Sequence, residues 1–130
     1  MNNYLKTIAA IILLSIANFA SAESKLITLN IHTSRNECEL FESGSAFKKN
    51  PFYLKGKIFE SKTGCSVSLP MSEFNEKFEI CALSKIEIMN INDSCSFNVN
   101  NINDEAEFTS QTHSGANATK PLCSFICKTK

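Results

Sequence analysis

The sequence of 130 residues contains no tryptophan, and no two of its six cysteines are separated by two residues. A buried tryptophan packed on a central disulfide is typical of immunoglobulin domains, so its absence argues against that fold. Zinc-binding domains and thioredoxin-like enzymes use cysteines at Cys-x-x-Cys spacing, which is missing here. We therefore expect no metal centre and no redox-active cysteine pair.

Several enzyme signatures are also missing. The chain has no Gly-x-Ser-x-Gly elbow, no glycine-rich phosphate loop, no calcium-loop pattern and no His-Glu-x-x-His helix. Its 13 basic side chains are balanced by 13 acidic ones, whereas proteins that bind nucleic acid or anionic membranes usually carry a basic excess. We expect no cofactor and no nucleic-acid partner, and we expect the partner to be another protein.

The first 22 residues have the three parts of a secretory signal peptide. Lys6 supplies the positive charge, residues 7–19 form an uncharged run, and residues 20–22 place small side chains before an expected cut at Glu23. A transmembrane helix needs about 20 apolar residues, and this run is shorter. We therefore expect cleavage, export to the periplasm or the extracellular space, and a single mature domain, residues 23–130, without a membrane span.

All six cysteines lie in the expected mature chain. An even number of cysteines in a small exported protein predicts a disulfide framework. At about 2–4 kcal/mol per bridge, three bridges match the net stability of a typical domain. The spacing leaves the connectivity open among Cys38, Cys65, Cys81, Cys95, Cys123 and Cys127.

Apolar and polar side chains alternate along most of the mature chain, which is typical of β-strands. The alternation runs through residues 25–32, 51–60, 65–69, 77–81, 85–91 and 95–99. Leu83 and Ser84 separate two of these segments and suggest a hairpin connection. Helical spacing appears only in residues 70–78, so we expect at most one short helix. The predicted fold class is mainly β, a small antiparallel sandwich or open barrel cross-linked by about three disulfides.

The final segment, residues 121–128, alternates in the same way and contains two cysteines four residues apart. In a strand, Cys123 and Cys127 point to the same side with their α-carbons about 13 Å apart, whereas one bridge needs less than about 7 Å. We therefore expect each to bond a different cysteine, so that the last strand is fastened at two points. In a helix the two would lie close enough to pair, so this expectation depends on the strand.

Two segments, residues 42–51 and 109–121, interrupt the alternation and are predicted to be loops. The first contains Lys48 and Lys49, and the second contains His113. Binding proteins commonly present loops on a rigid frame, because preorganisation lowers the entropy cost of binding. We therefore predict a non-enzymatic binding module, such as an inhibitor, an immunity-type protein or a host-interacting protein, that uses Lys48, Lys49 and His113.

Two other functions stay open. His32 and His113 are the only histidines, and two histidines can act as general acid and base in a small secreted hydrolase such as a ribonuclease. However, His32 lies on the polar face of a predicted strand and no pattern links it to His113, so two solvent-exposed histidines are the simpler interpretation. A structural component of the cell envelope is the third possibility, and self-assembly would reveal it.

We predict that the exported protein begins at Glu23 and contains no free thiol. Intact mass spectrometry before and after alkylation checks this, because unpaired cysteines gain the mass of the reagent and paired cysteines do not. Retention of the first methionine, or alkylation of the unreduced protein, would contradict export into an oxidising compartment.

Overall fold

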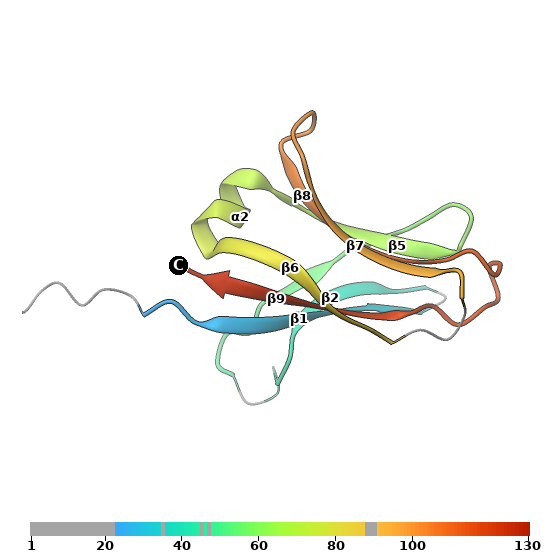
Figure 1. The fold of residues 1–130 in the computed structure, drawn as a ribbon, viewed down its shortest axis with the longest axis horizontal. Helices are drawn as coiled ribbons and strands as arrows, with labels where there is room; N and C mark the ends of the chain where they lie inside the picture. The colour runs from blue at the N-terminus through green and yellow to red at the C-terminus, as the bar shows by residue number, and fades with distance from the viewer. Residues whose placement is uncertain (1–22, 35, 45, 47, 88–90) are drawn as a thin grey trace, which may run out of the picture.

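A computed structural model describes residues 23–34, 36–44, 46, 48–87 and 91–130, which form two antiparallel sheets and one short helix (Figure 1). Sheet A has the strand order β3-β2-β1-β9-β6, and sheet B has the order β4-β5-β8-β7. The mainly β fold and the disulfide framework predicted from the sequence are confirmed. No described helix is long and apolar enough to cross a membrane.

The elements follow one another along the chain with few residues between them. They are β1 (Leu26–Thr33), β2 (Cys38–Glu42), β3 (Tyr53–Lys55), β4 (Lys57–Ile58), β5 (Gly64–Pro70), α2 (Met71–Lys77), β6 (Phe78–Glu87), β7 (Asp93–Asn100), β8 (Glu105–Thr112) and β9 (Leu122–Thr129). The predicted short helix is confirmed as α2, and the expected signal peptide lies outside the described residues.

Disulfides and contacts show which strands of the two sheets lie opposite each other. Cys38–Cys65 joins β2 to β5, and Cys95–Cys123 joins β7 to β9. Between these bridges, β1 contacts β8. Sheet A has one strand more than sheet B, and its edge strand β6 contacts β7, the edge strand of sheet B.

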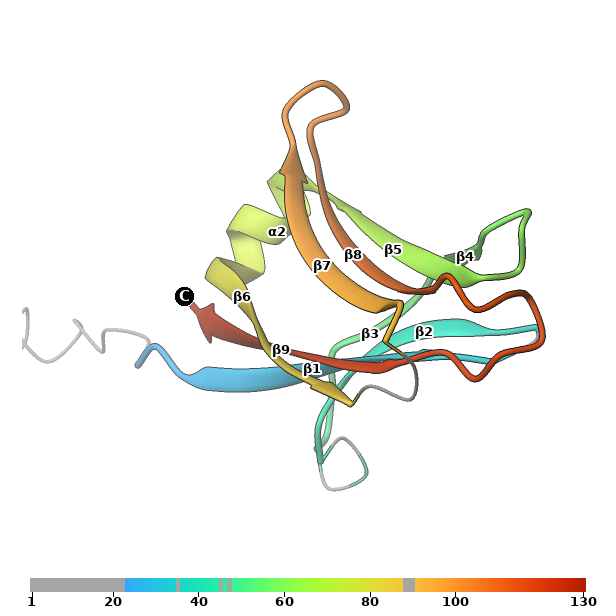
Figure 2. The same cartoon turned by 45° about the vertical axis from the view of Figure 1, so that its right-hand side comes forward.

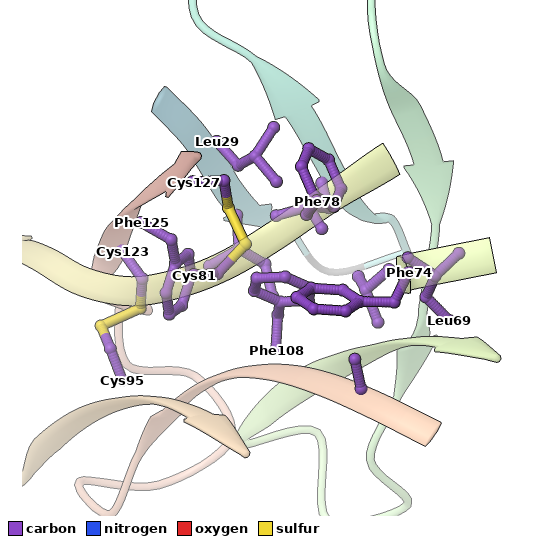
Figure 3. Packing of buried hydrophobic residues seen from close by; sticks show 14 of the residues in the cluster. Leu29, Leu69, Phe74, Phe78, Cys81, Cys95, Phe108, Cys123, Phe125 and Cys127 are labelled. Atoms are coloured by element: carbon purple, nitrogen blue, oxygen red, sulfur yellow. A yellow bond between two sulfur atoms is a disulfide. The ribbon is translucent and has the colours of Figure 1, made fainter. Parts of the chain in front are cut away.

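Phenylalanine rings fill the space between the sheets. Sheet B curves away from sheet A toward the end where α2 lies (Figure 2). There Phe74 of the helix packs on Phe78 and on Phe97, with ring centroids 5.5 and 5.6 Å apart. Phe108 continues the row, with ring centroids 4.8 Å from Phe97 and 5.0 Å from Phe125. Figure 3 shows Phe108 among the core residues. The helix thus closes the wider end of the sandwich with an aromatic side chain.

The last strand has the two covalent attachments expected from its sequence. Cys127 bonds Cys81 on the neighbouring strand β6, and Cys123 bonds Cys95 on the facing strand β7 (Figure 3). Both cysteines of β9 are fully buried, on the same side as Phe125. The prediction that Cys123 and Cys127 take different partners is confirmed.

The hairpin expected at Leu83 and Ser84 is wrong. β6 continues through both residues, and its register with β9 shifts between Leu83 and Lys85. Ser84 is therefore the extra residue of a β-bulge, and its hydroxyl donates to the Ser124 carbonyl at 3.1 Å. A bulge interrupts the alternation without ending the strand, which explains the error. The strand predicted over residues 85–91 is also too long, because β6 ends at Glu87, Ile91 lies in a turn, and residues 88–90 lie outside the described residues.

The segment predicted as one strand over residues 51–60 is divided between the two sheets. β3 belongs to sheet A and β4 to sheet B, and the chain crosses at Gly56. The Gly56 N–H donates to the Cys38 carbonyl at 2.7 Å. A β-carbon at this position would lie 2.3 Å from the Ser66 carbonyl oxygen and 2.6 Å from the Cys38 sulfur. Only glycine lets the chain pass the Cys38–Cys65 bridge this closely.

We predict that Gly56→Ala lowers the free energy of unfolding by about 1–3 kcal/mol, because the added methyl overpacks the crossing between the sheets. Urea unfolding with all bridges intact measures the change. Gly44→Asn is the control: nothing lies within 4 Å of its β-carbon position, and asparagine tolerates its φ of +71°. Gly44→Asn should change the free energy of unfolding by no more than about 0.5 kcal/mol. Equal stabilities of Gly56→Ala and the unmodified protein would show that the crossing is not tightly packed.

Candidate functional site

The loop predicted over residues 109–121 is shorter in the structure, because residues 109–112 complete β8. Along this strand Ala106, Phe108, Ser110 and Thr112 are all fully buried. Ser110 and Thr112 are polar, so the C-terminal half of β8 does not show the alternation of apolar and polar residues that predicts a strand. The remaining loop, residues 113–121, connects β8 to β9.

The two buried hydroxyls of β8 hold the two ends of this loop. Ser110 Oγ donates to the Pro121 carbonyl at 2.9 Å, and Thr112 Oγ1 accepts from the Ser114 N–H at 3.2 Å. A buried hydroxyl without a partner costs about 1–3 kcal/mol, so burial favours these bonds. The loop is therefore fastened to the core of the sandwich.

Lys120 organises the middle of the loop. Its ammonium group donates to the carbonyls of Ala116 and Ala118, at 2.5 and 2.6 Å. The Ala118 N–H donates to the Gly115 carbonyl at 3.1 Å, and Gly115 has a φ of +106° that side-chain-bearing residues rarely adopt. These bonds give the loop one compact conformation.

The loop lies at the end of the sandwich opposite α2 (Figure 2). Three hollows surround it. The largest, about 250 Å³, is lined by His32, Thr33, Glu87, Thr119, Lys120, Pro121 and Leu122. The second, about 240 Å³, is lined by Asn36, Lys62, Ala116, Asn117 and Lys120, and the third, about 190 Å³, by Thr33, Ser34 and residues 116–120. Lys120 lines all three. We call these lining residues, with the rest of loop 113–121, the loop end.

The loop end offers hydrogen-bonding groups of several kinds. Asn36 and Asn117 supply amides, Lys62 a cation, Glu87 a carboxylate and His32 an imidazole. Among the described residues, no group of three or more histidine, cysteine, aspartate or glutamate side chains is placed to hold a metal ion. The loop end is therefore suited to recognise a polar surface through hydrogen bonds and mixed charges.

Lys48 and Lys49, predicted to bind a partner, lie far from this end. Their segment, the β2–β3 connection, projects below sheet A (Figure 1). The Lys48 ammonium forms an ion pair with Glu42, whose side chain is only 10% exposed and also accepts from the Phe52 N–H at 3.2 Å. Lys48 thus neutralises a mostly buried carboxylate of its own chain, and Lys49 is exposed.

The two histidines do not line a common hollow. His32 lines the largest one, whereas His113 begins the loop outside its lining residues. His113 Nδ1 lies 2.9 Å from the Asn92 carbonyl oxygen, and the His113 N–H also donates to that oxygen. Lys120, a possible cationic assistant, already binds two carbonyls of the loop. The hollow at His32 therefore brings this histidine together with Glu87 and Lys120, and not with His113.

Sequence reasoning missed Asn36, Lys62, Asn117 and Lys120, which line the hollows. No motif singles them out, because three separate connections bring them together only after the sheets have packed. A weak signal existed in residues 105–112, where Glu105, Glu107 and Thr109 alternate with Ala106, Phe108 and Ser110. Recognising that strand would have placed the start of the loop at His113.

The outer face of sheet A borders the loop end and contains Tyr53, the one tyrosine among the described residues. In the register of β1, β2 and β3, His32 lies beside Glu39, and Glu39 beside Lys55. The Tyr53 hydroxyl donates to Glu39 Oε1 at 2.6 Å. This hydrogen bond raises the pKa of Tyr53, and partial burial and the negative charges of Glu39 and Glu37 act in the same direction.

Similarity to known proteins gives no information about the function of this chain. The chain matches no protein family model, no curated protein and no solved structure. Because a fold by itself does not imply a function, the function has to be inferred from the site.

We predict that Tyr53 in the mature protein ionises above the ordinary tyrosine pKa of about 10, because Glu39 stabilises the neutral phenol. Absorbance at alkaline pH follows this residue alone, since the other tyrosine, Tyr4, lies in the expected signal peptide. The stabilisation is present below the ordinary pKa and is lost as the pH rises through the raised value. Glu39→Ala should return the midpoint toward 10, and an unchanged midpoint would contradict the assignment.

Proposed function

We propose that the protein is a non-enzymatic binding module that acts in the periplasm or outside the cell and engages another protein through the loop end. All six cysteines are paired, which suits an oxidising compartment. In this proposal residues 1–22 direct export and are then cleaved, as their signal-peptide pattern predicts.

The observation that carries the proposal is the order of the loop before any partner binds. Lys120 and the buried hydroxyls of Ser110 and Thr112 hold the loop in place. Association therefore has little backbone entropy left to remove, which favours binding. Rigid frames that present such loops are a common arrangement in recognition proteins.

The size of the hollows favours a protein partner over a small molecule. Pockets for drug-sized ligands usually measure about 300–1,000 Å³ and are mainly apolar. The hollows of the loop end measure about 250, 240 and 190 Å³, which is below this range, and polar side chains take part in the lining of each. Each can accept a side chain of a partner, with amides and charges around it to satisfy polar groups.

We predict that Asn36→Ala/Lys62→Ala/Asn117→Ala weakens binding to the partner by at least about tenfold, because it removes three hydrogen-bonding groups of the loop end. The partner is first identified by cross-linking the oxidised mature protein in the medium or periplasm of the producing cells. Biolayer interferometry with that purified partner then measures the affinity.

Lys49→Ala is the matched control, because Lys49 is exposed on the β2–β3 connection, away from the loop end. The affinity of this variant for the partner should stay within about threefold of that of the unmodified protein. Lys120→Met, which keeps the aliphatic stem but removes the ammonium donors, should weaken binding as well. If Lys49→Ala abolishes binding and the triple variant does not, the partner binds the β2–β3 connection and the proposal is wrong.

A further inference from the structure

A larger hollow lies where α2 is followed by β6. Its volume is about 430 Å³, and it is lined by Ile27, Glu42, Asn50, Pro51, Phe52, Lys77, Phe78 and Thr129. Pockets that hold small organic molecules usually measure about 300–1,000 Å³ and are mainly apolar, with a few polar groups. The hollows of the loop end are smaller than this range, whereas this hollow falls within it. We call it the α2 hollow.

The α2 hollow has an apolar wall at the edge of the core. Phe78 is 2% exposed, and its ring packs edge-on against that of Phe52, with the centroids 5.2 Å apart. Ile27 lies on the same face of β1 as Leu29 and Ile31, because side chains alternate along a strand. Leu29 and Ile31 are fully buried, whereas Ile27 is only partly buried. Apolar surface that the core leaves accessible here would be buried by an apolar ligand, which favours binding.

The charge of Glu42, the acidic residue of this lining, is compensated within the chain. The Glu42 side chain is only 10% exposed and forms an ion pair with Lys48. Its second carboxylate oxygen accepts from the Phe52 N–H at 3.2 Å. A buried carboxylate needs such partners, because an unpaired one is costly. Since both oxygens already have partners, Glu42 does not require a cationic ligand.

Lys77 is the charged lining residue that lacks an ion pair. It is the last residue of α2, and it is exposed. The ion pairs found among the described residues use Lys48, Lys85 and Lys128, and none of them includes Lys77. The Lys77 carbonyl accepts from the Lys130 N–H at 3.2 Å, which holds the backbone beside the hollow. The α2 hollow thus combines an apolar wall with one uncompensated positive charge.

We propose that the α2 hollow binds a small organic anion with an apolar body. The apolar body packs on Ile27, Phe52 and Phe78, and the anionic group contacts the Lys77 ammonium. Charge selects this class of ligand, because an anion balances Lys77 whereas a cation is repelled by it. Fatty acids and aromatic acids share this chemistry. The α2 hollow has no lining residue in common with the loop end, so neither proposal depends on the other.

Two dyes with the same anilinonaphthalene rings test the proposal. 8-Anilinonaphthalene-1-sulfonate is anionic, whereas N-phenyl-1-naphthylamine lacks the sulfonate and is neutral. Titration of the oxidised mature protein with the sulfonate dye should give a saturable increase in fluorescence. Lys77→Met keeps an unbranched apolar side chain and removes the charge. It should weaken binding of the sulfonate dye at least about threefold and change that of the neutral dye by no more than about twofold.

Matched variants separate the proposed contacts from general effects. Lys57→Met is the control for charge, because Lys57 is exposed on β4 and does not line the α2 hollow. Ile27→Thr keeps a β-branched side chain but removes apolar surface from the wall, so it should weaken binding of both dyes at least about threefold. Leu26→Thr changes the neighbouring residue of the same strand, which is 69% exposed on the opposite face. Both control variants should bind the dyes within about twofold of the unmodified protein.

Competition against the sulfonate dye identifies the kind of anion. The competitors are octanoate, 3-phenylpropanoate and octylammonium, and the last has the opposite charge. Displacement by octanoate alone supports a fatty-acid site, by 3-phenylpropanoate alone an aromatic-acid site, and by both a site that accepts either class. Failure of both acids, or stronger displacement by octylammonium, would overturn the proposal. Sulfonate binding that does not saturate, or that Lys57→Met weakens as much as Lys77→Met, would overturn it as well.

Discussion

The covalent attachment of β9 on both sides is the constraint on which the rest of the structure depends. Cys127 ties this strand to its neighbour β6, and Cys123 ties it across the core to β7. Because both sulfurs lie on the same face as Phe125, the bridges and the aromatic core stabilise the same layer. β9 also pairs with β1, so β1 and β6 are positioned by β9 directly, β2 through β1, and β3 through β2 and β1.

The same two disulfides also fix the position of the loop end. Cys123 follows Pro121 and Lys120 closely, so fixing the start of β9 also fixes the end of the loop that Lys120 organises. In the facing sheet, the bridge from Cys123 holds β7 against β9, and β7 also contacts β6. The position of the loop and the packing of β7 on sheet A therefore have one structural origin.

Polar residues inside the sandwich connect the frame to the loop end. Ser110 and Thr112 occupy inward positions that a purely structural strand would fill with apolar side chains. Their hydroxyls bond the loop, and the loop in turn satisfies hydroxyls that would be costly to bury alone. The polar character of these positions hid the strand from the sequence analysis, and it is also the feature that makes the loop rigid.

From the sequence by itself, period-two alternation determined the mainly β class, and the helical spacing of residues 70–78 determined the short helix. Alternation also determined that Cys123 and Cys127 bond different partners, since strand geometry places these two on one face and too far apart to pair. It failed at Leu83 and Ser84, at Gly56 and along β8, where a bulge, a crossing and buried hydroxyls interrupt the pattern. The tertiary structure alone decided which cysteines pair, that Lys48 forms an ion pair with Glu42, and that Lys120 lines three hollows. These features depend on contacts between segments far apart in the chain, and local alternation carries no information about which strands become neighbours.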